Sequence, residues 1–356
     1  MVWDAHSLAQ RLDTATKDFE PPFAIIDLGA FDANRRDVAR RAGGARIRVA
    51  SKAWRARGAI SEGLRHSQFS GVLGFTLPEA LWLAEGSAGV EPITDVVVGY
   101  PTVDRHALRR LAHNPELAAR ITLMVDDVAH LALIHEAARD TATVIRVCID
   151  VDSSWRPRTP GKRRGPHIGA QRSPQHTEEQ VGDFAARVID SPAVDLVGLM
   201  FYESQIAGVG DAPSGHALRA RAISAMQSGS KRELARRRPR IVSTVNDLLV
   251  ERRGRRLEFV NAGGTGSLEF SSADASVTEV TAGSGFFAPT LFDSYKHFHP
   301  VPAASFALPV VRRPGPGTVT VLGGGYVASG IADASRLPTP WLPVGLKLDG
   351  QEGAGE

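Results

Sequence analysis

The chain has 356 residues, 43% of them hydrophobic and 23% charged, a composition typical of globular domains and not of disordered or fibrous chains. No run approaches the roughly 18 consecutive apolar residues of a membrane-spanning helix, so we expect no membrane partner. The formal net charge is only +3, and the basic runs at 156–165 and 236–240 have no interleaved aromatic residues, so we expect no nucleic-acid partner.

The first 22 residues are polar and mixed, without the basic and apolar segments of a secretory signal. Cys148 is the single cysteine of the sequence, which excludes an intrachain disulfide and a cysteine-cluster metal site. Both features agree with a reducing compartment, and we expect a cytoplasmic protein.

Short apolar runs bounded by polar or turn residues predict strands along most of the chain. These runs cover residues 23–28, 46–51, 71–75, 95–100, 121–125, 143–152, 194–202, 257–264 and 277–284. Runs of this length, separated by helical segments, are typical of a parallel sheet that is buried on both faces. We count about eight such strands between residues 23 and 284, which favours a closed (β/α)8 TIM-type barrel over an open doubly wound sheet.

Helix signals occur between the predicted strands. Residues 30–42 carry apolar side chains at helical spacing. Thr76 and Glu79 have the spacing of a capping box, and Asp126 is placed to cap the helix that follows it. The longest connection, at 205–256, is basic and predicts an elaborated helical unit.

The pattern changes after residue 300, where residues 303–313 and 317–327 predict strands with no helix between them. We therefore expect three parts: an N-terminal extension at 1–20, a barrel at 21–299 and the start of a C-terminal β domain at 300–356. The extension is expected to join the β domain.

Lys52 directly follows the strand predicted at 46–51. An isolated buried ammonium is costly, so a lysine at the end of a buried strand has a partner or a chemical function. In a (β/α)8 barrel the active site lies at the carboxyl ends of the strands, where Lys52, Tyr202 and the glycine-rich run 263–266 all fall. Glycines let backbone N–H groups approach a phosphate closely. A lysine that forms a Schiff base with a carbonyl, together with a phosphate cradle, matches pyridoxal 5′-phosphate.

Several motifs resemble one family of pyridoxal-phosphate enzymes, and they occur in the family's order at predicted strand ends. They are FAIIDLGAFDANRRDVAR with IRVASKAWR, then NAGGTGSLE, then VTEVTAGS. The resemblance is to enzymes that share the alanine racemase N-terminal barrel, and within them to the D-threonine aldolase-like and D-serine dehydratase-like branch. FYESQIAGVGD and LGGGYVASG are similar to an amino acid deaminase/aldolase subgroup, so the resemblance spans roughly residues 20–350.

The resemblance implies roles for particular residues. Lys52 would hold the cofactor as a Schiff base and then accept or donate a proton. Backbone groups of two glycine-containing loops would hold the phosphate. The cofactor-binding residues that the resemblance implies are Lys52, Tyr202, Gly263, Gly264, Thr265, Gly266, Gly283 and Ser284.

The sequence departs from this branch near the expected substrate position. His167 stands where the relatives carry an arginine, and YESQ at 202–205 differs from the corresponding sequence of the aldolases. We expect Tyr202, Glu203 and Gln205 to face the substrate. We count Lys52, Tyr202, Glu203 and His167 as catalytic candidates. Glu203 or His167 would serve as the base in a subgroup that works without a metal.

The branch uses a divalent metal held by its C-terminal β domain, and this chain ends before a matching ligand pair. His297 and His299 are the candidate ligands, because i,i+2 spacing would put both imidazoles on one face of a strand. The domain begun near residue 300 has too few strands to close, so we expect cofactor binding with little metal-dependent turnover. The resemblance also implies a homodimer.

The implied activity is aldol cleavage or deamination of a β-hydroxy D-amino acid, a small-molecule substrate. Pyridoxal phosphate is an electron sink that stabilises a carbanion at Cα, which suits both reactions. Two alternatives remain open, namely an amino-acid racemase and a non-catalytic pyridoxal-phosphate-binding protein. The strands predicted after residue 300 argue against the second alternative, because single-domain carriers of this barrel lack a β domain.

Overall fold

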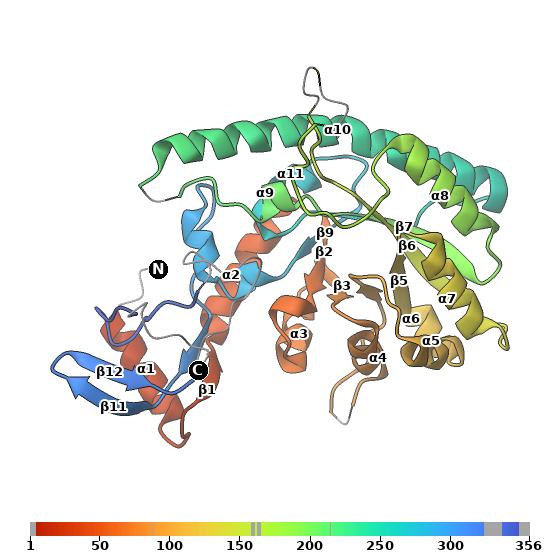
Figure 1. Cartoon of the computed structure of the whole chain (residues 1–356). Coiled ribbons are helices and arrows are strands. Elements are labelled where there is room, and N and C mark those ends of the chain that lie inside the picture. Colours follow the sequence, from red (N-terminus) through yellow and green to blue (C-terminus); the bar gives the residue numbers. More distant parts are fainter. Residues whose placement is uncertain are drawn as a thin grey trace. The chain divides into compact units, whose positions relative to one another are not determined.

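The computed structural model closes eight parallel strands into a barrel, as the sequence predicts (Figure 1). The strands are β2 (Arg46–Ala50), β3 (Phe69–Gly74), β4 (Val96–Val98), β5 (Ile121–Val125), β6 (Ile145–Val151), β7 (Val194–Phe201), β8 (Phe259–Ala262) and β9 (Glu279–Ala282). They pair in chain order, and β9 closes the barrel on β2, with Val49 opposite Ala282. The structure describes residues 5–87, 89–157, 161, 165–213, 215–323 and 337–348. The motif LGGGYVASG lies outside the described residues from residue 324 on.

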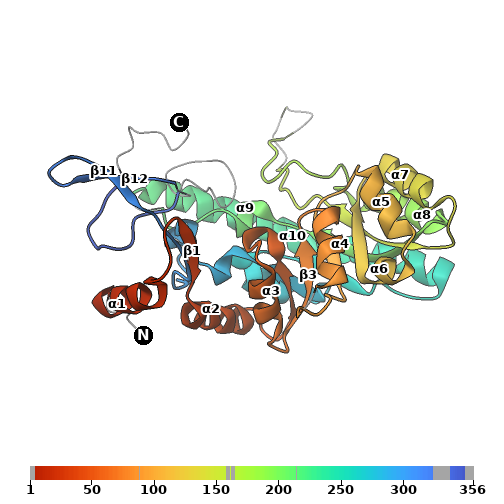
Figure 2. The same ribbon diagram turned by 90° about the horizontal axis from the view of Figure 1, so that it is seen from below.

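Helices follow most of the barrel strands in the sequence. They are α3 (Arg57–Leu64), α4 (Leu77–Glu85), α5 (Arg105–Ala112), α6 (Pro115–Arg120), α7 (Val128–Ala138), α8 (Glu178–Asp190), α9 (Ser204–Ala207), α10 (Ala217–Arg253) and α11 (Leu268–Ser272). Figure 2 shows α4, α5, α6 and α7 grouped together, and Figure 1 shows α8 lying along the long helix α10. The helix α10 confirms the helical elaboration predicted for the longest connection.

Local capping signals determine where several helices begin. The Thr76 hydroxyl accepts a hydrogen bond from Glu79 N at 3.3 Å, as the sequence predicts. The prediction that Asp126 caps the helix after β5 is wrong by one residue, because the Asp127 carboxylate accepts the bond from Ala129 N at 2.8 Å. The capping residue must have an extended backbone directly before the first turn, and Asp127 meets this condition with a φ of −139°.

The barrel strands contribute both an apolar cluster and a charged network to the core. The cluster consists of Val97, Met124, Cys148, Val197, Met200 and Phe259. Arg48 is 1% exposed and lies 5.4 Å from the centroid of the Phe259 ring, and its Nε donates to Glu279 Oε1 at 2.7 Å. Burial raises the pKa of the Cys148 thiol, so the single cysteine is an unreactive core residue.

The described contacts divide the chain into a barrel unit (residues 35–284) and a terminal unit (residues 1–34 and 285–356). In the terminal unit β1 (Phe23–Ile26) pairs antiparallel with β10 (Ala304–Ala307). The assignment of residues 23–28 to the barrel sheet is therefore wrong, because the hydrogen-bonding partner of this strand comes from the other end of the chain. β11 (Val310–Gly315) and β12 (Thr318–Val321) form a hairpin, which confirms the strands predicted after residue 300.

The terminal unit also contains α1 (Ala5–Thr16) and the start of α2 (Leu28–Arg41). Asn34 on α2 is 2% exposed and joins two later segments of this unit. Its Nδ2 donates to Phe286 O at 3.0 Å and to Val301 O at 2.7 Å, and its Oδ1 accepts from Val301 N at 2.8 Å. In the part of the chain that the structure describes, none of the helices has the length and apolar character needed to cross a membrane.

Candidate active site

Lys52 lies in a tight turn directly after β2, at the carboxyl end of the barrel. A 3₁₀ turn covers Ser51–Ala53, and Arg55 follows with a φ of 47° in the left-handed region. Trp54 is 5% exposed, and its Nε1 donates to Gly283 O at 2.9 Å. This bond joins the turn that carries Lys52 to the loop after β9, so two regions that the sequence assigned to the cofactor lie together.

Gly283 allows the end of β9 to lie directly against the end of β2. A Cβ added at Gly283 would lie 2.9 Å from Ala50 Cβ and 3.1 Å from Ala50 O. Real side chains do not fit at such distances without a shift of the backbone, so this close approach requires glycine. Ser284 follows and is half-buried.

A series of contacts runs from Lys52 across the mouth of the barrel, meaning the carboxyl ends of its strands. Lys52 Nζ lies 3.5 Å from Tyr100 Oη, at the outer limit of a hydrogen bond. The Arg172 guanidinium lies 5.4 Å from the centroid of the Tyr100 ring and 5.6 Å from that of Tyr202, within cation–π range of both. A Cβ added at Gly264 would in turn lie 3.2 Å from Tyr202 Cε2. These five residues are consecutive neighbours, and we call them the mouth arc.

Asp150, near the end of β6, holds Arg172 in place. Arg172 Nε and Nη2 lie 3.1 and 3.0 Å from Asp150 Oδ2, and Nη2 also donates to Gly99 O at 3.3 Å. Asp150 is 3% exposed, and burial raises the pKa of its carboxyl to about 6, although the charge of Arg172 acts in the opposite direction. Near neutral pH the carboxylate is therefore ionised, and Arg172 is a fixed positive charge at the mouth.

The glycine-rich loop (Gly263–Gly266) follows β8 and borders the mouth next to Tyr202. Gly263 has a φ of 86°, a conformation that favours glycine. A Cβ added at Gly264 would lie 3.0 Å from Ala207 Cβ, so the loop passes close to α9 only because this residue has no side chain. The loop continues as the 3₁₀ turn Thr265–Ser267. Phosphate binding by this loop stays a prediction.

Glu203 is placed differently from the substrate-facing position that we expected. Its side chain is fully buried, at 0% exposure. Its Oε1 accepts hydrogen bonds from Ser267 Oγ at 2.8 Å and from Ser271 Oγ, and its Oε2 accepts one from Gly263 N at 3.3 Å. The carboxylate therefore supports the glycine-rich loop from the protein interior. Tyr202, the preceding residue, is half-buried and belongs to the mouth arc.

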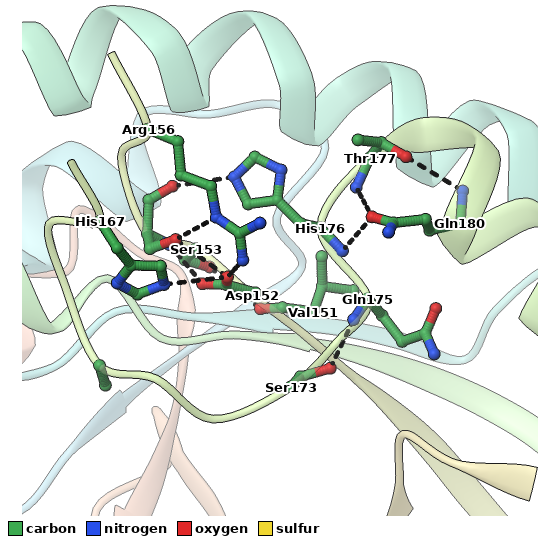
Figure 3. Close-up of polar contacts among 12 residues, drawn as sticks. Val151, Asp152, Ser153, Arg156, His167, Ser173, Gln175, His176, Thr177 and Gln180 are labelled. Atoms are coloured by element: carbon green, nitrogen blue, oxygen red, sulfur yellow. Dashed lines mark hydrogen bonds and ion pairs between the residues drawn. The ribbon is translucent and has the colours of Figure 1, made fainter. Parts of the chain in front are cut away.

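His167 belongs to a polar cluster around Asp152, just after the end of β6 (Figure 3). His167 Nε2 lies 3.4 Å from Asp152 Oδ2, Ser154 Oγ donates to the same atom at 2.9 Å, and Arg156 also pairs with it. Burial acts to raise the pKa of Asp152, but the hydrogen bonds from Ser154 and Arg156 outweigh it and lower the pKa. His167 therefore helps to hold the loop between β6 and α8, and a catalytic part for it stays a prediction.

The two candidate metal ligands lie outside any strand, so their predicted position on a strand face is wrong. His297 and His299 are both exposed, and Phe298 between them is buried. Phe298 packs with Phe292 and Tyr295, so the segment follows an aromatic cluster and not a sheet. Within the described ranges, no group of three or more His, Cys, Asp or Glu side chains is arranged to hold a metal ion.

Tyr100 and Arg172 are members of the mouth arc that the sequence analysis did not single out. Tyr100 closed the strand predicted at 95–100, but β4 ends at Val98, so Tyr100 lies beyond the strand end as Lys52 does. A search for polar aromatic residues at every strand end would have found it. Arg172 lies in the loop between β6 and α8, where no local sequence signal distinguishes it from the other arginines.

A profile of the alanine racemase N-terminal domain family matches residues 26–287. The chain belongs to this family. The matched range contains all the barrel strands, Lys52 and the glycine-rich loop. Membership of the alanine racemase N-terminal domain family confirms the resemblance that the motifs indicate, and it implies pyridoxal 5′-phosphate as the cofactor.

A 3-hydroxy-D-aspartate aldolase from Paracoccus denitrificans is 27% identical over 276 residues, which is 76% of this chain and 61% of the relative. The chain thus spans only 61% of the length of this curated relative. A D-threonine aldolase from Filomicrobium marinum matches with a TM-score of 0.64 and 22% identity, over 86% of this chain and 73% of that one. The D-threo-3-hydroxyaspartate dehydratase from Delftia sp. HT23 matches with a TM-score of 0.59 and 20% identity, over 83% and 68%. These two solved structures support the fold.

The residues at the mouth fit a phosphorylated aldehyde. Lys52 offers a half-buried primary amine, and Gly264 exposes backbone beside Tyr202 where a Cβ would fill the space. Arg172 adds a positive charge that Asp150 holds in place. An amine, a cradle without side chains and a fixed cation are the groups that bind an aldehyde, a phosphate and a carboxylate.

Proposed function

We propose that this protein is a pyridoxal-phosphate-dependent lyase that acts on a β-hydroxy D-amino acid, either by aldol cleavage or by dehydration with deamination. The observation that carries the proposal is the Lys52 amine at the barrel mouth, in the same arc of contacts as the glycine-rich loop. The name of the relative from Paracoccus denitrificans, 3-hydroxy-D-aspartate aldolase, supports the substrate class.

Bound pyridoxal phosphate supplies an electron sink for the electron pair left at Cα when a bond to that atom breaks. Lys52 would bind the cofactor aldehyde through Nζ, and the glycine-rich loop would bind its phosphate through backbone N–H groups. Tyr100 Oη, 3.5 Å from Lys52 Nζ, is placed to exchange a proton with that amine. Arg172, over the rings of Tyr100 and Tyr202, would bind the carboxylate of the amino acid.

The test of cofactor binding is reduction of the holoprotein with borohydride, followed by peptide mass analysis. We expect the reduced cofactor on the peptide that contains Lys52, and a visible absorbance band that is lost in Lys52→Arg. Lys231→Arg, which changes a lysine on α10, is the matched control and should keep both signals. A label on another lysine, or a label retained in Lys52→Arg, would refute the proposal.

The test of the reaction is a product assay on D-threonine, D-serine and D-3-hydroxyaspartate, with their L forms as controls. Aldol cleavage of D-threonine yields glycine and acetaldehyde, whereas dehydration with deamination yields ammonia and a keto acid. We propose that turnover depends little on added manganese, magnesium or zinc, and each assay is run with and without these ions. Strong stimulation by one of them would contradict that part of the proposal.

We also propose that the protein is a homodimer. The β11–β12 hairpin supports this, because Val310 and Val321 are paired across it and are 53% and 41% exposed. Exposed apolar side chains that lie together on a hairpin favour coverage by another surface. Sedimentation velocity of wild type and of Val310→Lys tests this, and a monomeric wild type would contradict it.

A further inference from the structure

The carboxylate of Glu203 is surrounded by hydrogen-bond donors that belong to the glycine-rich loop and to the segment after it. Ser267 Oγ donates to Oε1 at 2.8 Å, Ser271 Oγ donates to the same atom, and Gly263 N donates to Oε2 at 3.3 Å. Glu203 and Ser271 are 0% exposed, and Ser267 is 3% exposed. A buried carboxylate is stable only when it is paired and hydrogen-bonded, so the ionised Glu203 side chain depends on these donors.

Arg238 on α10 places a positive charge beside both Glu203 and Asp274. Arg238 is 0% exposed, its Nη2 lies 3.6 Å from Glu203 Oε2, and its Nη1 donates to Asp274 Oδ2 at 3.1 Å. Its guanidinium lies 5.5 Å from the ring centroids of both Phe201 and Phe270. Packing from α10, β7 and α11 therefore fixes the position of the charge beneath the loop.

The Ser267 hydroxyl connects this ion pair to the backbone of the loop. It donates its hydrogen to Glu203 and accepts a hydrogen bond from Gly264 N at 3.2 Å. Glu203 binds Gly263 N directly. Two successive peptide N–H groups of the loop are thus oriented by one carboxylate, and Gly264 is the residue that borders Tyr202 in the mouth arc.

We propose that Arg238 and Glu203 form an anchor that sets the conformation of the glycine-rich loop, and with it the affinity for the cofactor phosphate. Glu203 is then a positioning residue that acts through Ser267 and Gly263, and it does not touch the substrate. This inference rests on the proposed function, because it takes the loop to be the phosphate site. Preorganised groups bind more tightly since no conformational freedom is lost on binding.

A simple charge effect and the anchor predict opposite changes in the affinity for pyridoxal phosphate when the charge of Glu203 is removed. A negative carboxylate near a phosphate repels it, so removal of the charge alone would raise the affinity for pyridoxal phosphate. Removal of an anchor would lower the affinity, because the loop would lose its fixed conformation. Glu203→Gln therefore separates the two effects by the sign of the change.

The first experiment compares two serines that bind the same carboxylate. The dissociation constant for pyridoxal phosphate is measured by titrating the apoprotein, and the melting temperature of each apoprotein is measured alongside. We expect Ser267→Ala to weaken binding roughly five- to tenfold, the value of one hydrogen bond, and Ser271→Ala to change it less than about twofold. Both variants should lower the melting temperature to a similar extent, which separates the loop effect from general destabilisation.

The second experiment makes the same type of substitution, glutamate to glutamine, in each of two buried ion pairs of the barrel unit. Glu203→Gln should weaken binding of pyridoxal phosphate, whereas Glu279→Gln, in the pair with Arg48, should leave the affinity unchanged. Equal affinities for wild type, Ser267→Ala and Glu203→Gln, or tighter binding by Glu203→Gln, would overturn the anchor and leave the proposed function intact. A wild type that does not bind pyridoxal phosphate would overturn the proposed function, and the anchor with it.

Discussion

The pair formed by Arg48 and Glu279 gives a quantitative test of how the barrel holds charge in its interior. Both side chains are 1% exposed, and two hydrogen bonds of 2.7 and 3.0 Å join them. Asn261 Nδ2 donates to Glu279 Oε1 at 2.8 Å, and Asp95 binds the other edge of the Arg48 guanidinium at 2.8 and 3.0 Å. The perturbation is the pair of single variants Arg48→Met and Glu279→Leu, together with the double variant.

The single variants each leave a buried charge without its main partner. Loss of one member of a buried ion pair costs about 3–5 kcal/mol of unfolding free energy. We expect Glu279→Leu near the lower limit, because Asp95 still binds Arg48. We expect Arg48→Met near the upper limit, because Asn261 alone remains among the described hydrogen-bond donors to the Glu279 side chain.

The double variant removes both charges and leaves the Asn261 amide without its acceptor, which costs about 1–3 kcal/mol. The loss of unfolding free energy expected for the double variant therefore does not exceed the smaller of the two single losses. It is well below the sum of the two single losses, which is about 8 kcal/mol.

Urea denaturation followed by circular dichroism measures the unfolding free energies, with the slope checked for constancy among the variants. Losses that add in the double variant would refute the reasoning, since additivity would mean that the two charges do not stabilise each other.

Two further predictions concern stability. Gly283→Ala should lower the unfolding free energy by about 1–3 kcal/mol, because the new Cβ would lie 2.9 Å from Ala50 Cβ. Gly58→Ala on α3 is the control, because its Cβ meets no heavy atom within 4 Å, and it should raise the unfolding free energy by about 0.5–1 kcal/mol. The urea midpoints of the two variants are compared with that of wild type. Burial raises the pKa of Asp150 from 3.8 to about 6, so the folded protein retains a proton that the unfolded chain releases, and this contribution to stability falls as pH rises through that range. Asp150→Asn should therefore become more stable relative to wild type at pH 7 than at pH 4.5, and a difference independent of pH would contradict the prediction.

Local patterns in the sequence were sufficient to predict the barrel and to place Lys52 at its mouth. Apolar runs of strand length alternate with capped helices, and this order has few compact solutions other than a closed parallel barrel. Lys52 and Gly264 could be placed at the mouth because each lies at or just beyond the carboxyl end of a strand, and in a parallel barrel these strand ends converge.

Only the tertiary structure shows which strand β1 pairs with and where the Glu203 side chain lies. The strand at Phe23–Ile26 looks like a barrel strand, but it pairs with Ala304–Ala307 because backbone pairing depends on which edge is free and not on the strand's own residues. Glu203 follows Tyr202 at the same strand end, but Tyr202 borders the mouth and Glu203 points into the interior. The backbone turns at Glu203, whose φ of −84° and ψ of 71° are not those of a strand. Only the serines and Arg238, brought from distant segments, make the buried position favourable for a carboxylate.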